Sequence, residues 1–205
     1  MASQSTNPYV NFATGLLEEA KILMNGDGWQ QVATSAQNTK LEQKNLPNIC
    51  SFPCYLVSST IKKPKEELVK KIWEADLERA KKNDPKLKMM AEVETGPNWK
   101  VRSQYNGMGP LIWDRHTVFA QVRTDVGNVT YLTGFSVDHP KAPTNTTTHV
   151  RTNMHMSIYE FTAVGPKETN IRRIAQIDPK GDIPTWVVKM FANNNMNMFD
   201  MWKNE

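Results

Sequence analysis

The sequence predicts an α+β domain built on a curved antiparallel sheet of about nine strands, with an N-terminal helix, a helical insertion after the third strand and a long C-terminal helix. Two observations predict this class. Near both ends of the chain, apolar residues recur every three or four positions, as on the buried face of a helix. From Lys88 onward the period changes to two, the period of a half-buried strand. Because a twisted antiparallel sheet of this length curls strongly, we expect a concave side that the two terminal helices cover.

Length and composition indicate one globular domain over residues 1–205. Charged residues make up 22% and hydrophobic residues 39%, and no linker rich in proline, glycine and serine divides the chain. No stretch approaches the roughly 18 consecutive apolar residues of a membrane span, and the polar N-terminus lacks the apolar core of a signal peptide. We therefore expect a cytoplasmic protein in which Cys50 and Cys54 are free thiols. The net charge of +4 is spread along the chain without a nucleic-acid-binding motif, which favours brief contact with anionic lipid head groups over nucleic acid.

The N-terminal half of the chain predicts helices and strands in alternation. Asn7 and Pro8 are suited to begin a helix that Gly26 ends. A second helical period follows Pro64, and the polar, basic stretch after it is interpreted as a loop or a short helix. The expected elements are a helix over 9–24, strands over 29–32, 39–43 and 52–62, a helix over 64–77, and the loop or short helix over 79–88.

The period of two in the C-terminal half predicts a meander of long strands, each separated from the next by a turn or loop, most of them containing glycine, proline or asparagine. The expected strands cover 90–95, 100–105, 116–124, 129–137, 151–164 and 169–177.

The C-terminal helix is the most distinctive element of the sequence. Asp182 is expected to cap it and Pro184 to lie in its first turn, where no backbone hydrogen bond is lost. The helix holds four of the chain's eleven methionines, side chains that adapt to apolar partners of variable shape. By itself this pattern is also that of an ordinary amphipathic helix packed on a sheet. The apolar face comprises Ile183, Trp186, Val187, Met190, Phe191, Met198, Met201 and Trp202.

The turn before this helix carries a resemblance to a known family. The pattern Asp-Pro-x-Gly-x-Ile-Pro-x-Trp is formed by Asp178, Pro179, Gly181, Ile183, Pro184 and Trp186. With the order of elements upstream, it resembles the end of a START domain, the lipid-transfer module related to the steroidogenic acute regulatory protein. The resemblance implies a helix-grip fold, in which the sheet wraps around the C-terminal helix. It also implies that an internal apolar cavity binds a lipid and that the domain carries it between membranes through the cytosol, without a cofactor or a catalytic residue.

The partners expected from this resemblance are a lipid ligand, phospholipid or sterol-like, and a membrane surface that a monomer contacts transiently. Two alternatives stay open: an enzyme or ligand sensor that uses the same cavity, and a protein-interaction domain with a filled core. A mainly apolar cavity of at least several hundred cubic ångströms would exclude the last of these. The sequence contains no common catalytic motif, and His149 and His155 lie too far apart on a strand to share a metal ion.

An apolar loop after Gly107 is a candidate gate. Apolar residues at the tip of an exposed loop often mark an interaction site or a lid, and START domains open their cavity between the last helix and a loop at this position. The alternative is that the loop folds back and Trp113 belongs to the core. The gate residues are Met108, Leu111, Ile112 and Trp113.

Arg115 is a candidate cavity residue. Members of the family often carry an Arg-Asp pair near this position whose arginine pairs with an acid inside the cavity. Here the order is reversed, as Asp114-Arg115. If Arg115 is buried, Glu92 or Glu94 on the neighbouring strand are the available carboxylates; otherwise it is an exposed arginine at a strand start.

The remaining candidate ligand-binding residues come from the strand over 151–164 and from the last helix. Met154, Met156 and Ile158 are expected to share one face of that strand. We also expect Gly181 to adopt a backbone conformation that a Cβ atom disfavours. The predicted ligand-binding set is Arg115, Glu94, Trp113, Met154, Met156, Ile158, Trp186, Met190, Phe191 and Met198.

Overall fold

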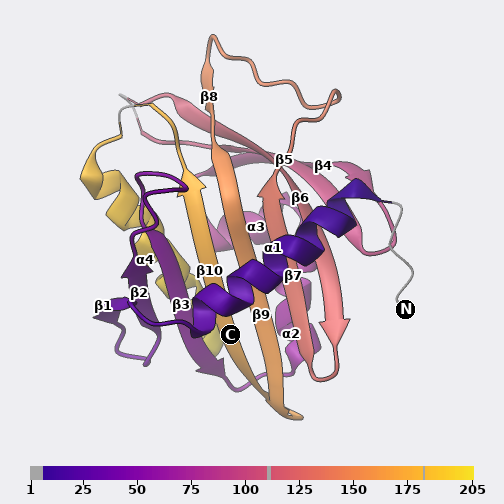
Figure 1. The fold of residues 1–205 in the computed structure, drawn as a ribbon, viewed down its shortest axis with the longest axis vertical. Coiled ribbons are helices and arrows are strands. Elements are labelled where there is room, and N and C mark those ends of the chain that lie inside the picture. Colours follow the sequence, from indigo (N-terminus) through magenta and orange to yellow (C-terminus); the bar gives the residue numbers. More distant parts are fainter. Residues whose placement is uncertain (1–6, 110–111, 182) are drawn as a thin grey trace.

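The computed structural model describes residues 7–109, 112–181 and 183–205, without the side chains of 185–186 and 188–192. In the described part, ten strands form one sheet in the order β1-β2-β3-β10-β9-β7-β6-β5-β4, with β8 paired to β6 alone (Figure 1). Every pairing is antiparallel except that of β6 with β8. The strands are β1 (Gln30–Thr34), β2 (Lys40–Lys44), β3 (Cys54–Ile61), β4 (Leu87–Thr95), β5 (Trp99–Asn106), β6 (Asp114–Val126), β7 (Val129–Ser136), β8 (His149–Arg151), β9 (Asn153–Gly165) and β10 (Glu168–Asp178).

The tenth strand, β8, exists because Thr152 interrupts the strand predicted over 151–164. The Thr152 side chain is buried, and its amide donates a hydrogen bond to the carbonyl of His116 at 3.0 Å. This bond holds β8 parallel to the start of β6, whereas β9 pairs with β7 and β10. The other predicted strands of the meander are confirmed, with ends that differ by up to three residues.

Helix α1 (Pro8–Asn25) covers one face of the sheet. The Asn7 side chain accepts a hydrogen bond from the amide of Tyr9 at 2.9 Å, which confirms the predicted N-cap. The helix packs on β6, β7 and β9. Its buried side chains and those of the sheet form an apolar cluster, the α1 cluster, which includes Leu16, Leu17, Ala20, Val118, Ala120, Phe135, Met156 and Ile158.

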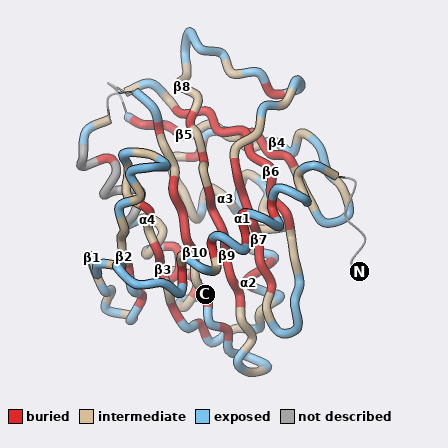
Figure 2. The backbone as a smooth tube through the Cα atoms, viewed as in Figure 1, coloured by how far each residue is buried: buried red, intermediate tan, exposed pale blue. Residues whose placement is uncertain are grey.

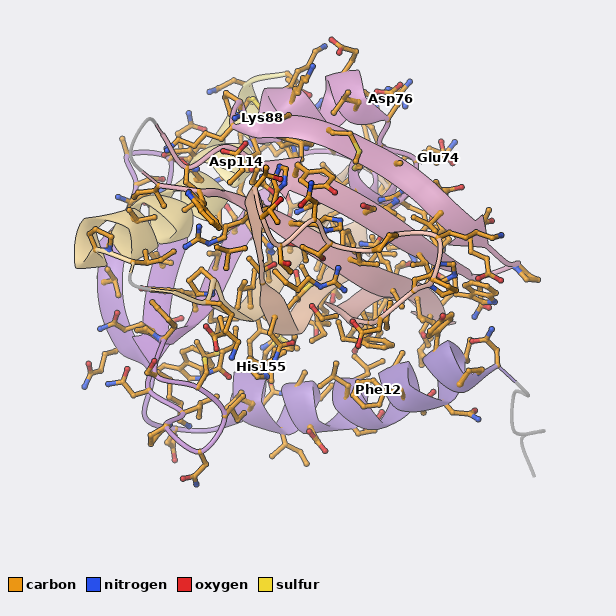
Figure 3. The ribbon with its side chains drawn as sticks, turned by 90° about the horizontal axis from the view of Figure 1, so that it is seen from above. Phe12, Glu74, Asp76, Lys88, Asp114 and His155 are labelled. Atoms are coloured by element: carbon orange, nitrogen blue, oxygen red, sulfur yellow. The ribbon has the colours of Figure 1, made fainter. Side chains whose placement is uncertain are left out.

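The other three helices, α2 (Lys65–Trp73), α3 (Leu77–Asn83) and α4 (Thr185–Asn204), lie on the opposite face. In Figure 3, α1 runs below the sheet while the other helices lie on its upper side. The expectation that both terminal helices cover the same concave side is therefore wrong. Strand β9 shows that the two terminal helices lie on opposite faces. Ile158 belongs to the α1 cluster, whereas the next residue, Tyr159, packs with α4. The central strands are buried on both faces, as the red tubes of Figure 2 show.

Two short helices replace the single helix predicted over 64–77. Helix α2 ends at Trp73, and α3 begins at Leu77 after the cap Asp76, whose carboxylate accepts a hydrogen bond from the amide of Arg79 at 2.8 Å. An aspartate that satisfies a free amide of the first turn starts a new helix at this point. The stretch interpreted as a loop or short helix over 79–88 is thus mostly the second half of α3 and the start of β4.

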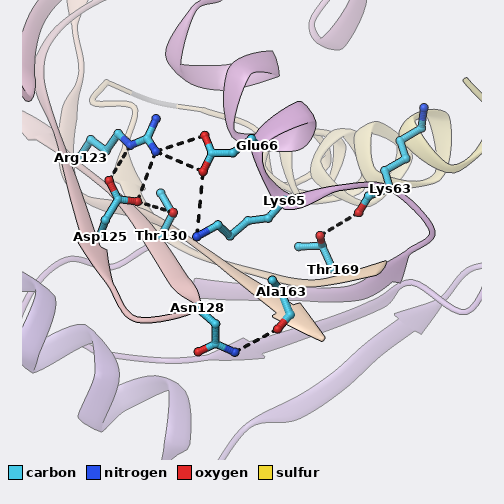
Figure 4. Close-up of polar contacts among 9 residues, drawn as sticks. All are labelled: Lys63, Lys65, Glu66, Arg123, Asp125, Asn128, Thr130, Ala163 and Thr169. Atoms are coloured by element: carbon cyan, nitrogen blue, oxygen red, sulfur yellow. Dashed lines mark hydrogen bonds and ion pairs between the residues drawn. The ribbon is translucent and has the colours of Figure 1, made fainter. Parts of the chain in front are cut away.

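Polar contacts hold α2 and the residues before it against the end of β6 and the start of β10 (Figure 4). Arg123 at the end of β6 donates to Glu66 of α2 at 3.2 Å and to Asp125 at 2.9 Å. The Thr169 hydroxyl of β10 donates to the carbonyl of Lys63 at 2.8 Å. Exposed ion pairs contribute little to stability, so we attribute to these contacts the orientation of α2 and not its free energy of docking.

Two parts of helix α4 are buried. Val187 in its first turn is 0% exposed, and Met198, Phe199 and Trp202 in its C-terminal half are buried against β2, β3 and the apolar side of α2. These parts of the predicted apolar face are confirmed. The helix begins at Thr185, and Pro184 precedes its first turn instead of lying in it. The predicted cap Asp182 lies outside the described residues.

Candidate ligand pocket

A pocket of about 290 Å³ lies between the sheet and helices α2, α3 and α4. Most of its lining surface is apolar, so the space under α4 is not filled by a closed core. The volume is smaller than the several hundred cubic ångströms that the sequence led us to expect, and it lies at the lower end of the roughly 300–1,000 Å³ usual for small-molecule pockets. The apolar part of the lining includes Phe119, Met154, Ala175, Ile177 and Met198.

Three of the predicted ligand-binding residues, Arg115, Met154 and Met198, line this pocket. Glu94 lies elsewhere, and its carboxylate pairs with the Nε2 atom of His139 at 2.8 Å. Met156 and Ile158 belong to the α1 cluster on the other face of the sheet. The side chains of Trp186, Met190 and Phe191 lie outside the described residues.

A β-bulge explains why Met154 and Met156 do not share a face. In the pairing of β9 with β10, Met156 is opposite Gln176 and Met154 is opposite Ile177, which leaves His155 as an extra residue in β9. An extra residue shifts the alternation of the strand by one position. Met154 therefore faces the pocket with Ser157 and Tyr159. His155 and Met156 lie on the side of the sheet that α1 covers, where Figure 3 labels His155.

The described residues of the candidate gate loop differ in their exposure to solvent. The Trp113 side chain is 56% exposed, so the alternative in which it belongs to the core is excluded. Ile112 is half-buried, whereas Met108 is 1% exposed and belongs to the interior. Leu111 lies outside the described residues. Of the four predicted gate residues, Trp113 alone is both described and well exposed.

Arg115 ties the gate loop to the turn before α4. Its side chain is 4% exposed, and its Nε atom donates to the carbonyl of Pro179 at 2.7 Å while Nη2 donates to that of Lys180 at 3.0 Å. Its Nη1 atom donates to the carbonyl of Trp113. Burial lowers the pKa of the guanidinium, and Asp114 opposes that shift.

The expectation that a buried Arg115 pairs with Glu92 or Glu94 is therefore wrong. Glu92 pairs with Lys100 at 2.8 Å instead. Three backbone carbonyls can balance a buried guanidinium because each accepts a charge-assisted hydrogen bond. Arg115 thus acts as a clamp between two segments that border the pocket, and each of its three guanidinium nitrogens donates to a backbone carbonyl.

The turn that Arg115 holds adopts the conformation expected for Gly181. Gly181 has φ +70°, and Lys180 also has a positive φ of 55°. The Asp178 carboxylate supports the turn by accepting a hydrogen bond from the amide of Lys180 at 2.9 Å. Positive φ values are costly for residues with a Cβ atom, which explains glycine at the second position.

We expect Gly181→Val to lower the free energy of unfolding by about 2 kcal/mol, because a β-branched residue is strained at this φ. Urea denaturation measures the loss. Gly15→Val is the matched control, since Gly15 lies in α1 and a Cβ atom added there would meet open space. Equal losses for the two variants would show that backbone strain in this turn is not the constraint.

Three cationic residues of the pocket, Lys71, Arg102 and Arg173, were not predicted. Arg102 is 4% exposed and donates to the carbonyls of Ile72 at 3.0 Å and Trp73 at 2.6 Å, which satisfies the last turn of α2. On β5 the polar residues Arg102, Gln104 and Asn106 line the pocket. Polar residues at every second position of a strand usually lie on a face exposed to solvent. The sequence pattern therefore predicts solvent exposure for these residues, and not a place in the pocket.

Within the described residues, no group of three or more histidine, cysteine, aspartate or glutamate side chains is arranged to hold a metal ion. The buried His116 is bonded on both ring nitrogens, to the hydroxyls of Ser103 and Thr144, each at 2.8 Å. Burial lowers its pKa to about 4, so the ring is neutral at pH 7. We assign His116 a structural role. None of the described helices is both long and apolar enough to cross a membrane.

The fold and the pocket together define a helix-grip domain, a long helix packed across a curved sheet above a largely apolar space. The model of the START domain family matches residues 12–203 of the chain. The chain therefore belongs to the START domain family, whose members are lipid-transfer domains that are usually non-catalytic, although some helix-grip relatives are enzymes.

Sequence identity to an individual curated protein is modest. The chain is 28% identical over 188 residues to human Rho GTPase-activating protein 7, an alignment that covers 87% of this chain and 11% of that protein. The chain thus spans about a tenth of the length of this curated relative.

Solved structures share the fold at low sequence identity. Human StAR-related lipid transfer protein 5 has a TM-score of 0.82 at 16% identity, covering 96% of this chain and 95% of that one. The lipid transfer and protein localization domain of human StarD13 (DLC2) has a TM-score of 0.72 at 20% identity, covering 98% of each. These structures support the order of helices and strands described above.

Proposed function

We propose that this domain binds a lipid or another hydrophobic ligand in the pocket under α4 and carries it between membranes through the cytosol. The observation that carries the proposal is the largely apolar pocket between the sheet and α4 in a chain of the START family. Each buried methylene contributes about 0.8 kcal/mol, so a tail of some twelve carbons costs on the order of 10 kcal/mol to expose to water. An enclosed apolar pocket removes most of that barrier, and a carrier of this kind needs no catalytic group.

The pocket volume narrows the class of ligand. At about 290 Å³, the pocket suits a single-chain or compact ring-shaped amphiphile better than a phospholipid with two long chains. A sterol-like or single-chain ligand is thus favoured over the phospholipid alternative. Organic extraction of the purified protein followed by mass spectrometry tests this directly. We expect one dominant amphiphile in about equimolar amount, and an extract without bound amphiphile would contradict the proposal.

We also propose that the gate loop meets the membrane through Trp113. An exposed tryptophan can bury its ring among acyl chains. Trp113 does not itself line the pocket, but its carbonyl is held by Arg115, which lines the pocket and also holds the turn leading to α4. Contact of Trp113 with lipid would therefore affect Arg115, the residue that also fixes the turn before α4. We therefore propose that the ligand enters between this loop and α4.

We expect Trp113→Ala to weaken binding to anionic vesicles by about tenfold, since burying a large apolar side chain contributes roughly 1.5–3 kcal/mol. The free energy of unfolding should change by less than about 0.5 kcal/mol, because the side chain is exposed. Vesicle sedimentation measures binding, and Val164→Ala is the control, an exposed apolar residue at the far end of β9. Equal vesicle binding by Trp113→Ala and the wild-type protein would place the membrane contact elsewhere.

A further inference from the structure

The cations that line the pocket outnumber its acids, and one of them is incompletely bonded. The lining includes Lys71, Arg102, Arg115 and Arg173 but, among the described residues, a single carboxylate, Asp84. Lys71 pairs with Glu205. Arg102 and Arg115 are bonded to backbone carbonyls as described above. Arg173 is therefore the cation whose partners decide what the pocket attracts.

Arg173 projects from β10 beside neutral groups. Its Nη1 atom donates to the Asn195 side chain of α4, and its Nη2 atom donates to the Ser157 hydroxyl at 3.2 Å. The guanidinium carbon lies 4.8 Å from the centre of the Tyr159 ring, a cation–π contact. Its Nε atom is buried and has no hydrogen-bond partner among the described residues. No described carboxylate lies within 4.0 Å of this guanidinium, as an ion pair would require.

Asp84, the one described carboxylate that lines the pocket, does not pair with Arg173. Its carboxylate accepts hydrogen bonds from the Asn106 side chain at 2.6 Å and from the amide of Lys86 at 3.0 Å, which are contacts within the protein. Burial raises the pKa of Asp84, and the charge of Arg173 opposes that rise. Asp84 thus interacts with the charge of Arg173 without bonding to it. On the edge of the guanidinium formed by Nε and Nη2, the only hydrogen bond to a described residue is that of Nη2 to the Ser157 hydroxyl.

A buried guanidinium is costly unless its donors and its charge are satisfied. Its Nε and one Nη atom form a fork that matches the two oxygens of a carboxylate or phosphate. The Ser157 hydroxyl beside Nη2 could donate to the same anion. The apolar wall formed by Phe119, Met154 and Ala175 lies in the same pocket and provides a surface for hydrocarbon.

We propose that the pocket binds an amphiphile with one anionic head group, a carboxylate or a phosphate, and that Arg173 binds this group through Nε and Nη2. This inference rests on the proposed function and specifies the ligand's charge. The hydrocarbon part of the ligand lies along the apolar wall, under Met198 of α4. Because Asn195 of the same helix bonds Arg173, a bound head group and the position of α4 are coupled through one side chain.

The experiment compares ligands of equal chain length by isothermal titration calorimetry. The probes are oleate, oleyl alcohol, sodium acetate and inorganic phosphate. We expect oleate to bind the wild-type protein at least tenfold more tightly than oleyl alcohol, and acetate and phosphate to bind at least a hundredfold more weakly than oleate. Arg173→Met should lower oleate affinity at least tenfold and leave oleyl alcohol affinity unchanged. Arg172→Met is the matched control, because Arg172 pairs with Glu160 at 2.8 Å and does not line the pocket.

The outcomes separate this inference from the function on which it rests. Equal affinity of the wild-type protein for oleate and oleyl alcohol would overturn the anionic head group and leave hydrophobic binding intact. Acetate or phosphate binding as tightly as oleate would overturn the amphiphile and identify a simple anion site. Binding of none of the four probes would overturn both proposals for single-chain ligands. The comparison of oleate with oleyl alcohol needs only the wild-type protein, so it stands even if Arg173→Met fails to fold.

Discussion

Trp202→Ala should lower the free energy of unfolding by about 4 kcal/mol, because truncation of a fully buried tryptophan removes its apolar contacts and leaves a cavity. Trp202 is 1% exposed, its ring lies 5.5 Å from that of Phe199, and its Nε1 atom donates to the Asn83 side chain at 3.0 Å. Asn83 ends α3, so this one side chain joins two of the three helices that wall the pocket.

Urea denaturation measures this loss, and two further variants divide it. Trp202→Phe keeps most of the apolar area but removes the N–H donor, so it isolates the bond to Asn83, for which we expect about 1 kcal/mol. Trp113→Ala, the exposed tryptophan, is the matched control and should change stability by less than about 0.5 kcal/mol. A loss below about 1 kcal/mol for Trp202→Ala would mean that α4 does not depend on this residue for its docking.

Arg115→Met should lower the free energy of unfolding by about 3 kcal/mol. Methionine fills part of the volume of the arginine stem but leaves the carbonyls of Trp113, Pro179 and Lys180 without the donors they have now. Hydrogen bonds that involve a charged group contribute roughly 1.5–3 kcal/mol each, and bonds made by one side chain are not additive. Loss of the clamp should also free the turn before α4.

Arg115→Lys is the informative companion variant. Lysine keeps the charge but presents its donors at one point, so it cannot reach three carbonyls that a planar fork spans. We expect it to recover less than half of the loss. Hydrogen exchange of the backbone amides over 178–181 should be faster in both variants than in the wild-type protein. Wild-type stability and exchange in Arg115→Met would show that the clamp is not needed to hold the turn.

Periodicity predicted the fold well because most strands are long and regular. The strands of the meander and the N-cap at Asn7 follow from local chemistry, and the structure contains them. The resemblance of the turn at 178–186 added the arrangement of sheet and helix. The sides of the terminal helices could not be predicted, because the amphipathic pattern of α1 shows that one face is buried but not which face of the sheet buries it.

The pocket was predicted less well than the fold, and two physical reasons account for this. The extra residue His155 shifts the alternation of β9, so Met156 and Ile158 face α1, and a one-residue bulge leaves no mark in the hydrophobic pattern. Arg102 and Arg173 stand at polar positions of half-buried strands, which a sequence pattern assigns to water. Arg102 is buried and Arg173 half-buried because helices α2 and α4 close over them, a tertiary effect.

If the ligand is carried in the pocket under α4, a variant that fills this pocket should slow lipid transfer between vesicles. Ala80→Trp adds an indole from α3, a helix without fully buried residues, at a position that lines the pocket. Ala91→Trp is the matched control, because Ala91 is exposed on β4 and does not line the pocket.

Donor vesicles would contain isotope-labelled phosphatidylcholine, cholesterol and the single-chain anionic lipid lysophosphatidate, and mass spectrometry of the acceptor vesicles would measure transfer above the spontaneous rate. We expect the wild-type protein and Ala91→Trp to transfer at least one of these lipids at similar rates. Ala80→Trp should transfer it at least tenfold more slowly while melting at a similar temperature. Transfer by Ala80→Trp at the wild-type rate, or no transfer of any of the three lipids by the wild-type protein, would contradict the proposal that the pocket carries the ligand.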